Sequence, residues 1–74
     1  MLVVGSLVEF NWWSDYMALA VIPDHNGHSS WHTIHPGDTG IVLEVCECDD
    51  TVTVLFSGVN KHLRIHVSML RTII

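Results

Sequence analysis

The segment Gly40–Phe56 constrains the fold of this chain more than any other. It reads GIVLEVCECDDTVTVLF, so two runs rich in β-branched residues flank an acidic centre. Alternating β-branched residues favour strands, and Asp49 and Asp50 favour a turn because their side chains bond nearby backbone groups. The segment therefore predicts a β-hairpin with strands at Gly40–Val45 and Val52–Phe56.

Short segments on both sides of this hairpin also have the pattern of strands. After a turn at Ser57–Asn60, KHLRIHV places its leucine, isoleucine and valine on one face and its polar residues on the other. Upstream, SLVEF alternates with Val8 and Phe10 on one side, and YMALAVI reads as a strand that ends at Pro23. RTII can pair again after a short turn near SML, and no segment has sustained helical periodicity. The chain is therefore predicted to be all-β.

The shortness of these strands narrows the choice among all-β folds. They are too few for a β-sandwich, whereas a small closed barrel leaves few strand edges exposed. We expect one domain, residues 1–74, folded as a five-stranded SH3-like barrel with a long first loop over residues 11–38, whose arms are MALAVI and WHTI. The predicted core consists of Val8, Phe10, Ile41, Leu43, Val45, Val52, Val54, Phe56, Leu63, Ile65 and Leu70.

Four stretches of the chain resemble a known group of proteins. GSLVEF, PGDTGIVLEV, VTVLFSG and LRIHVSMLRTI, in this order, are similar to small SH3-like barrel proteins of unknown function from tailed bacteriophages, marine ones especially. The resemblance covers residues 5–10 and 36–73 and implies the same barrel, with a structural or accessory role of phage type. Such proteins often carry Trp where this chain has Phe56, and their first loop is usually shorter.

One of these stretches has a second resemblance. PGDTGIVLEV is similar to the KOW motif of ribosomal and transcription-elongation proteins, in which a glycine-containing loop leads into a strand. KOW domains that bind RNA are typically basic, whereas this chain has a net charge of −5, with Lys61, Arg64 and Arg71 as its only bases. It therefore lacks the basic stripe that displaces counterions from nucleic acid. A nucleic-acid-associated barrel of KOW or Tudor type remains the alternative.

The composition indicates apolar surface that is available to a protein partner. Hydrophobic residues make up 49% of the chain and charged residues 15%, against about 25% charged in a typical soluble domain. The start, MLVVGSLVEF, has neither the basic region of a signal peptide nor an apolar run long enough to span a membrane. We therefore expect no secretion and no membrane partner, and a location in the host cytoplasm or the virion.

Four histidines lie close together in the segment DHNGHSSWHTIH. On an α-helix, His25, His28, His32 and His35 would share one face, as ligands of a helical metal site do. The intervening Asn, Gly, Ser and Thr residues are weak helix formers, so the helix is not expected. On a hairpin arm, His32 and His35 instead lie on opposite faces. We interpret the segment as a polar loop, without a metal site.

Cys46 and Cys48 are too few for the disulfide framework of a small secreted domain, which indicates a reducing compartment. A zinc knuckle usually has two residues between its cysteines and a second pair elsewhere, for which only His62 and His66 are available. We interpret the cysteines as reduced, half-buried thiols. Cys46, His62 and Asp38 could be written as a catalytic triad, but no family signature surrounds the cysteines. No enzyme activity, catalytic residue, metal or cofactor is predicted.

The aromatic residues of the first loop form the predicted binding surface. Trp12 and Trp13 face opposite ways on an extended chain, so only one of them can join the core. Together with Tyr16 and Trp31 they suit a protein interface, unless the loop arms fold over the barrel and bury them. The sequence therefore predicts a non-enzymatic module that binds itself or a neighbouring protein. The predicted binding residues are Trp12, Trp13, Tyr16, Trp31, His62, Arg64 and His66.

Overall fold

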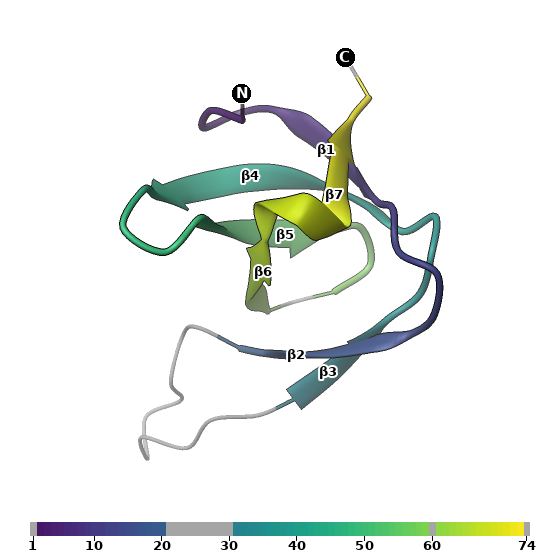
Figure 1. The fold of residues 1–74 in the computed structure, drawn as a ribbon. Helices are drawn as coiled ribbons and strands as arrows, with labels where there is room; N and C mark the ends of the chain where they lie inside the picture. Colours follow the sequence, from purple (N-terminus) through teal and green to yellow (C-terminus); the bar gives the residue numbers. More distant parts are fainter. Residues whose placement is uncertain (1, 21–30, 60, 74) are drawn as a thin grey trace.

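The structure is a computed structural model that describes residues 2–20, 31–59 and 61–73 (Figure 1). Its elements, in chain order, are β1 (Leu7–Phe10), β2 (Tyr16–Leu19), β3 (Trp31–Ile34), β4 (Thr39–Cys46), β5 (Thr51–Phe56), β6 (His62–His66), the 3-10 helix η1 (Val67–Met69) and β7 (Leu70–Thr72). The prediction of an all-β chain is confirmed. A helix long and apolar enough to cross a membrane does not occur in these ranges.

The strands form two sheets in which all neighbours are antiparallel. Five strands pair in the order β6-β5-β4-β1-β7, and β2 pairs with β3 as a separate hairpin. In Figure 1 this hairpin lies on the side of β6, away from the chain ends, and a bridge between Ala20 and Leu63 connects the two parts. The described residues contain seven strands instead of the five predicted, because the arms of the first loop pair with each other.

The turns of the larger sheet are formed by side chains that bond the backbone. Asp49 accepts hydrogen bonds from the amide and the hydroxyl of Thr51, at 3.3 and 2.7 Å, in the turn between β4 and β5. Asp50 adopts a φ of 57° there, a conformation that Asp tolerates better than most residues. Before β4, the carboxylate of Asp38 accepts from the amide of His35 at 2.9 Å. The predicted turn at the acidic centre of the hairpin is confirmed.

The hydrophobic core lies between the larger sheet and the hairpin. Eight of the predicted core residues are buried: Val8, Phe10, Val52, Val54, Phe56, Leu63, Ile65 and Leu70. The core also includes Ala18, Ala20 and Ile34 from the hairpin region, together with Val42 and Met69. The hairpin therefore does more than connect two strands, because it covers one side of the core.

The prediction that Ile41, Leu43 and Val45 of β4 are buried in the core is wrong. Ile41 is 44% exposed and the other two are only partly buried, whereas Val42 is fully buried. The pairing with β5 shifts between Val42 and Glu44, which is a β-bulge. Because a bulge adds one residue to one strand, it changes which residues face inward. Val45, beyond the bulge, packs against the edge of the core.

Gly40 determines which face of β4 points inward before the bulge. It is buried, and a Cβ at this position would lie 2.7 Å from the carbonyl oxygen of Leu55 and 3.0 Å from the Cα of Phe56. Both neighbours are backbone atoms of the adjacent strand, which cannot move aside without disturbing the pairing. Position 40 can therefore face the core only as glycine, and Ile41 must face outward.

We predict that Gly40→Ala lowers the free energy of unfolding by about 3 kcal/mol, the upper part of the usual range for overpacking, since the added methyl group meets backbone atoms of β5. Gly58→Ala is the matched control. Gly58 has a φ of 81° but open space around a Cβ, so its substitution costs only about 1–2 kcal/mol of left-handed strain. Urea denaturation of both variants measures the difference. A larger loss for Gly58→Ala than for Gly40→Ala would contradict the prediction.

Candidate interaction surfaces

The structure divides the predicted aromatic cluster into separate contacts. Trp12 packs against the core, and Trp13, whose ring centroid lies 6.4 Å away, is 83% exposed. Tyr16 contacts Phe10 with 6.3 Å between the ring centroids. Trp31 lies at the other end of the hairpin ladder from Tyr16 and is 60% exposed. One of the adjacent tryptophans therefore joins the core and the other is exposed, as predicted.

The hairpin presents a small apolar patch to solvent. Leu19 and Trp31 are cross-strand neighbours, and Met17 lies two residues from Leu19 on the same face. All three are exposed, while Ala18 and Ile34 on the opposite face are buried. Strand alternation therefore separates an inward face, which completes the core, from an outward face that carries large apolar side chains.

The histidines of the first loop do not share one face in the described residues. In β3, His32 is partly buried beside buried Ile34, while His35 beyond the strand end is exposed. His25 and His28 lie outside the described residues. The prediction of a strand for this arm is confirmed, and with it the divergence of His32 and His35.

The predicted polar face of β6 is also confirmed. His62, Arg64 and His66 alternate with buried Leu63 and Ile65; His62 is partly buried, and the other two are exposed. The Nδ1 atom of His66 contacts the Oγ of Ser68 at 2.8 Å, so this ring caps η1. These three side chains belong to the outer face of the larger sheet, and the tryptophans belong to the first loop. The predicted binding residues therefore come from two separate parts of the fold.

A row of apolar side chains crosses the outer face of the larger sheet. Leu7 is the cross-strand neighbour of Ile41, and Ile41 is the neighbour of Leu55. The amide of Ile73 donates to the carbonyl of Leu7 at 2.9 Å, which places Ile73 beside β1. Leu7, Ile41 and Ile73 are 38%, 44% and 48% exposed, and Leu55 is partly buried. We call these four side chains, Leu7, Ile41, Leu55 and Ile73, the apolar row.

The apolar row lines an open groove of about 490 Å³. The rest of the described lining is Thr39, Gly40, Phe56, Ser57, Gly58 and Val59, so none of the described residues that line the groove carries a charge. Sequence reasoning missed this surface because it assigned Ile41 to the core. The signal that could have revealed it was Gly40, whose lack of a side chain suits a strand position packed directly against its neighbour.

Charged residues lie on both sides of the apolar row, and each of the two groups contains one acidic residue and one arginine. On one side, Arg71 of β7 forms an ion pair with Glu9 of β1. On the other side, Glu44 and Arg64 are the cross-strand neighbours of Thr53, which is only 6% exposed between them. An apolar centre with a polar rim is the usual arrangement of a protein interface.

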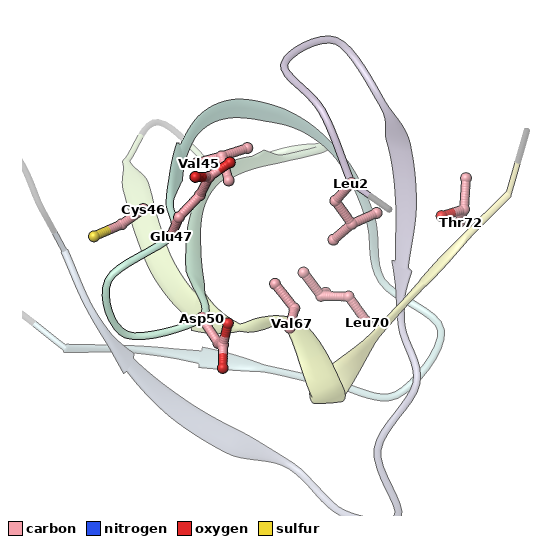
Figure 2. A pocket seen from close by; sticks show the side chains of 8 residues that line it. All are labelled: Leu2, Val45, Cys46, Glu47, Asp50, Val67, Leu70 and Thr72. Carbon is pink, nitrogen blue, oxygen red and sulfur yellow. The ribbon is translucent and has the colours of Figure 1, made fainter.

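A second cavity lies near the turn between β4 and β5 (Figure 2). Its volume is also about 490 Å³, and Figure 2 shows Leu2, Val67 and Leu70 pointing toward its centre, while the sulfur of Cys46 points away. Glu47 and Asp50 supply carboxylates to the lining, and none of the described residues that line it is a histidine. The cavity therefore does not combine the thiol with an imidazole base.

The two cysteines meet at the end of β4. Cys46 is partly buried, Cys48 is exposed, and their Sγ atoms lie 2.6 Å apart as free cysteines. The contact with Cys46 raises the pKa of the Cys48 thiol. The pKa of Asp49 is lowered, first by its hydrogen bond from the Thr51 side chain and then by Cys46. His62 pairs with Leu55, at the other end of β5 from Thr51, so the hypothetical triad is not assembled.

An ion pair joins the two arms of the hairpin at its open end, where Asp15 precedes β2 and His35 follows β3. The Nδ1 atom of His35 lies 2.9 Å from the Oδ1 atom of Asp15, and both side chains are exposed. The hydrogen bond and the charge of Asp15 raise the pKa of His35 above its ordinary value, with a smaller contribution from Asp38. The stability that this pair contributes is therefore present at pH values below the ordinary histidine pKa, and it is lost as the pH rises through the folded pKa.

We predict that Asp15→Asn lowers the pKa of His35 toward that of an unperturbed histidine, since the substitution removes the charge that favours the imidazolium. NMR titration of the His35 ring in the two proteins measures this shift. Asp50→Asn, which removes a carboxylate from a different turn, is the control and should leave the His35 titration unchanged. An equal His35 pKa in wild type and Asp15→Asn would contradict the assignment.

Comparisons with known proteins do not assign this chain to a family. No family model matches it, and no curated protein or solved structure matches it significantly. The resemblance to phage barrels and to the KOW motif therefore depends on the stretches quoted above. The candidate function follows instead from the apolar row and its surroundings.

Proposed function

We propose that this chain is a non-enzymatic, SH3-like module that binds protein, and that the apolar row is its binding surface. The observation that carries the proposal is the exposure of neighbouring large apolar side chains on the outer face of the sheet. They line a groove without charged residues. Contiguous exposed apolar surface of this kind is typical of interaction sites.

Two features support the SH3-like arrangement. In the sheet order, β1 lies between β4 and β7, so the first strand pairs with both β4 and the last strand. The Ala20–Leu63 bridge brings the first loop against β6 and extends the pairing beyond the five strands. The proposed role, a structural or accessory component of phage type, is supported by the sequence resemblance alone.

The proposed partner is a second copy of this chain. A two-fold contact places the same surface of both copies together, so the apolar row packs against itself. The net charge of −5 repels two copies at long range. At the contact, however, the described lining is uncharged, and Glu9 on one side of the apolar row is paired with Arg71. Association through the apolar row therefore does not place charged side chains of the described lining against each other.

The surroundings of the bases do not favour the nucleic-acid alternative. Arg71 is engaged by Glu9, and the charge of Arg64 acts on Asp49, whose pKa it lowers. A nucleic-acid surface needs bases that are available to phosphates along one stripe. Within the described ranges, these arginines are placed beside acidic residues instead.

We predict that wild type self-associates and that Ile41→Lys weakens the association at least about tenfold. Burying a large aliphatic side chain contributes about 1.5–3 kcal/mol, and each 1.4 kcal/mol corresponds to a factor of ten. Met17→Lys, the same kind of change on the exposed hairpin face, is the matched control. Light scattering after size exclusion, over a range of concentrations, measures the association of all three proteins.

Two results would contradict this prediction. Wild type that remains a strict monomer at high concentration would exclude the second copy as partner. Equal weakening by Ile41→Lys and Met17→Lys would show that the apolar row is not the contact. Trp13→Ala completes the comparison, since Trp13 is the most exposed of the aromatic residues that the sequence predicted to bind. We expect this variant to associate as wild type does.

We also predict that association strengthens when the pH is lowered from 7.5 to about 5.5. Protonation of all six histidines changes the formal charge from −5 to −5 + 6 = +1, which removes nearly all net repulsion between copies. The dissociation constants at the two pH values measure the effect, and high salt should reduce the difference because it screens exposed charges. Weaker association at the lower pH would contradict the prediction.

A further inference from the structure

The turn between β4 and β5 brings together three side chains that can bind a metal. The thiols of Cys46 and Cys48 and the carboxylate of Asp49 place their ligand atoms within 4.8 Å of one another. Cys48 and Asp49 are exposed, and Cys46 is partly buried, so a cation can reach the group from solvent. We propose that Cys46, Cys48 and Asp49 bind one thiophilic divalent cation of the zinc class.

The geometry of the two sulfurs supports chelation by one ion. Their Sγ atoms lie 2.6 Å apart and both cysteines are free, so the two thiols meet at one point of the turn. Zinc–sulfur bonds of about 2.3 Å at a tetrahedral ion place the two sulfurs about 3.8 Å apart. Because Cys48 is exposed, its side chain has room to move away from Cys46 by the difference of about 1.2 Å.

The carboxylate of Asp49 is oriented by its neighbour. Its Oδ1 atom accepts the Thr51 hydroxyl at 2.7 Å and the Thr51 amide at 3.3 Å. Thr51 is itself the cross-strand partner of Cys46, so the residue that orients one ligand pairs with the residue that provides another. Partners of this kind fix the direction of ligands in metal sites and strengthen binding.

The backbone holds the turn at a second point. The carbonyl oxygen of Asp50, next to Asp49, accepts the amide of Val67 at 2.9 Å, which fastens the turn to the start of η1. The ligands therefore lie on a short segment whose ends are held by β4, β5 and η1. A site held in this way loses less conformational freedom on binding than a flexible loop does.

The donor set determines the class of cation. Two thiolates favour zinc-like ions over magnesium and calcium, which prefer oxygen ligands. Binding requires both cysteines as thiolates, so it releases their protons to solvent. Three protein ligands leave one tetrahedral position for water, in contrast to the closed sets of structural zinc sites.

The three ligand residues are not among the buried residues of the core. The proposal goes beyond the sequence interpretation, which read the cysteines as reduced thiols without a metal. Sequence reasoning considered His62 and His66 as the complement of the cysteines and overlooked Asp49. In the structure, Thr51 lies between Cys46 and His66 in the ladder, and the His66 ring caps η1. The adjacent carboxylate is therefore better placed than either histidine.

The test uses the full chain, reduced, stripped with a chelator and free of any histidine tag. Cd²⁺ is the probe, because thiolate-to-cadmium charge transfer absorbs in the ultraviolet and reports thiolate coordination directly. We expect one Cd²⁺ per chain with this absorbance, competition by an excess of Zn²⁺ and no competition by Mg²⁺. Cys46→Ser and Cys48→Ser should each lose most of the absorbance.

Two further variants test the carboxylate and its support. Asp49→Asn should keep the absorbance but bind more weakly, and Thr51→Val should weaken binding by about tenfold or more through loss of the orienting hydroxyl. Asp50→Asn is the matched control, since it removes a neighbouring carboxylate outside the ligand set, and it should bind as wild type does. Circular dichroism of each variant establishes that the fold is retained.

Several outcomes would overturn the proposal. These are absence of the charge-transfer absorbance, one Cd²⁺ per two chains, or unchanged binding in Cys48→Ser. A Cys46–Cys48 disulfide that persists in reducing buffer would also exclude the site, and the mass of the intact chain detects it as the loss of two hydrogens. None of these outcomes depends on self-association, so they leave the proposed function unaffected.

Discussion

The arrangement of the larger sheet depends on the close approach of β4 to β5 at Gly40. A side chain at this position would collide with the backbone of Leu55 and Phe56, so the two strands can pair at this register only because residue 40 is glycine. The contact assigns Val42 to the core and Ile41 to solvent, and the β-bulge after Val42 then returns Val45 toward the core edge. The apolar row exists because of this one packing constraint.

Much of the fold could be predicted because local patterns and packing agree over most of the chain. In β1, β5 and β6 the spacing of two between apolar residues identifies the buried face, and the structure confirms it for Val8, Val54 and Leu63. The acidic turn was equally predictable from the chemistry of Asp49 and Asp50. In β4, however, apolar residues occupy both faces, so alternation alone could not tell inside from outside. A β-bulge also leaves no recognisable pattern in a strand that has apolar residues on both faces.

The candidate sites were harder to predict because they depend on which strands become neighbours. Leu7, Ile41 and Ile73 are far apart in the sequence and meet only through the order β4-β1-β7. The aromatic residues looked like one surface because they share a loop, but pairing of the loop arms separates Tyr16 from Trp31. By contrast, the cysteines and Asp49 are close in sequence. The sequence did not reveal that the turn brings their ligand atoms together.

The β2–β3 hairpin has one face that packs on the core and one face that is exposed to solvent. Its inward face closes the core through Ala18 and Ile34, while its outward residues, including Trp31, are exposed and are not among the described residues of the groove lining or the cysteine turn. The outward positions are therefore free to change without altering the surface that the larger sheet presents. In a chain built in this way, substitutions on the outward face of the hairpin change one exposed surface and leave the outer face of the larger sheet as it is.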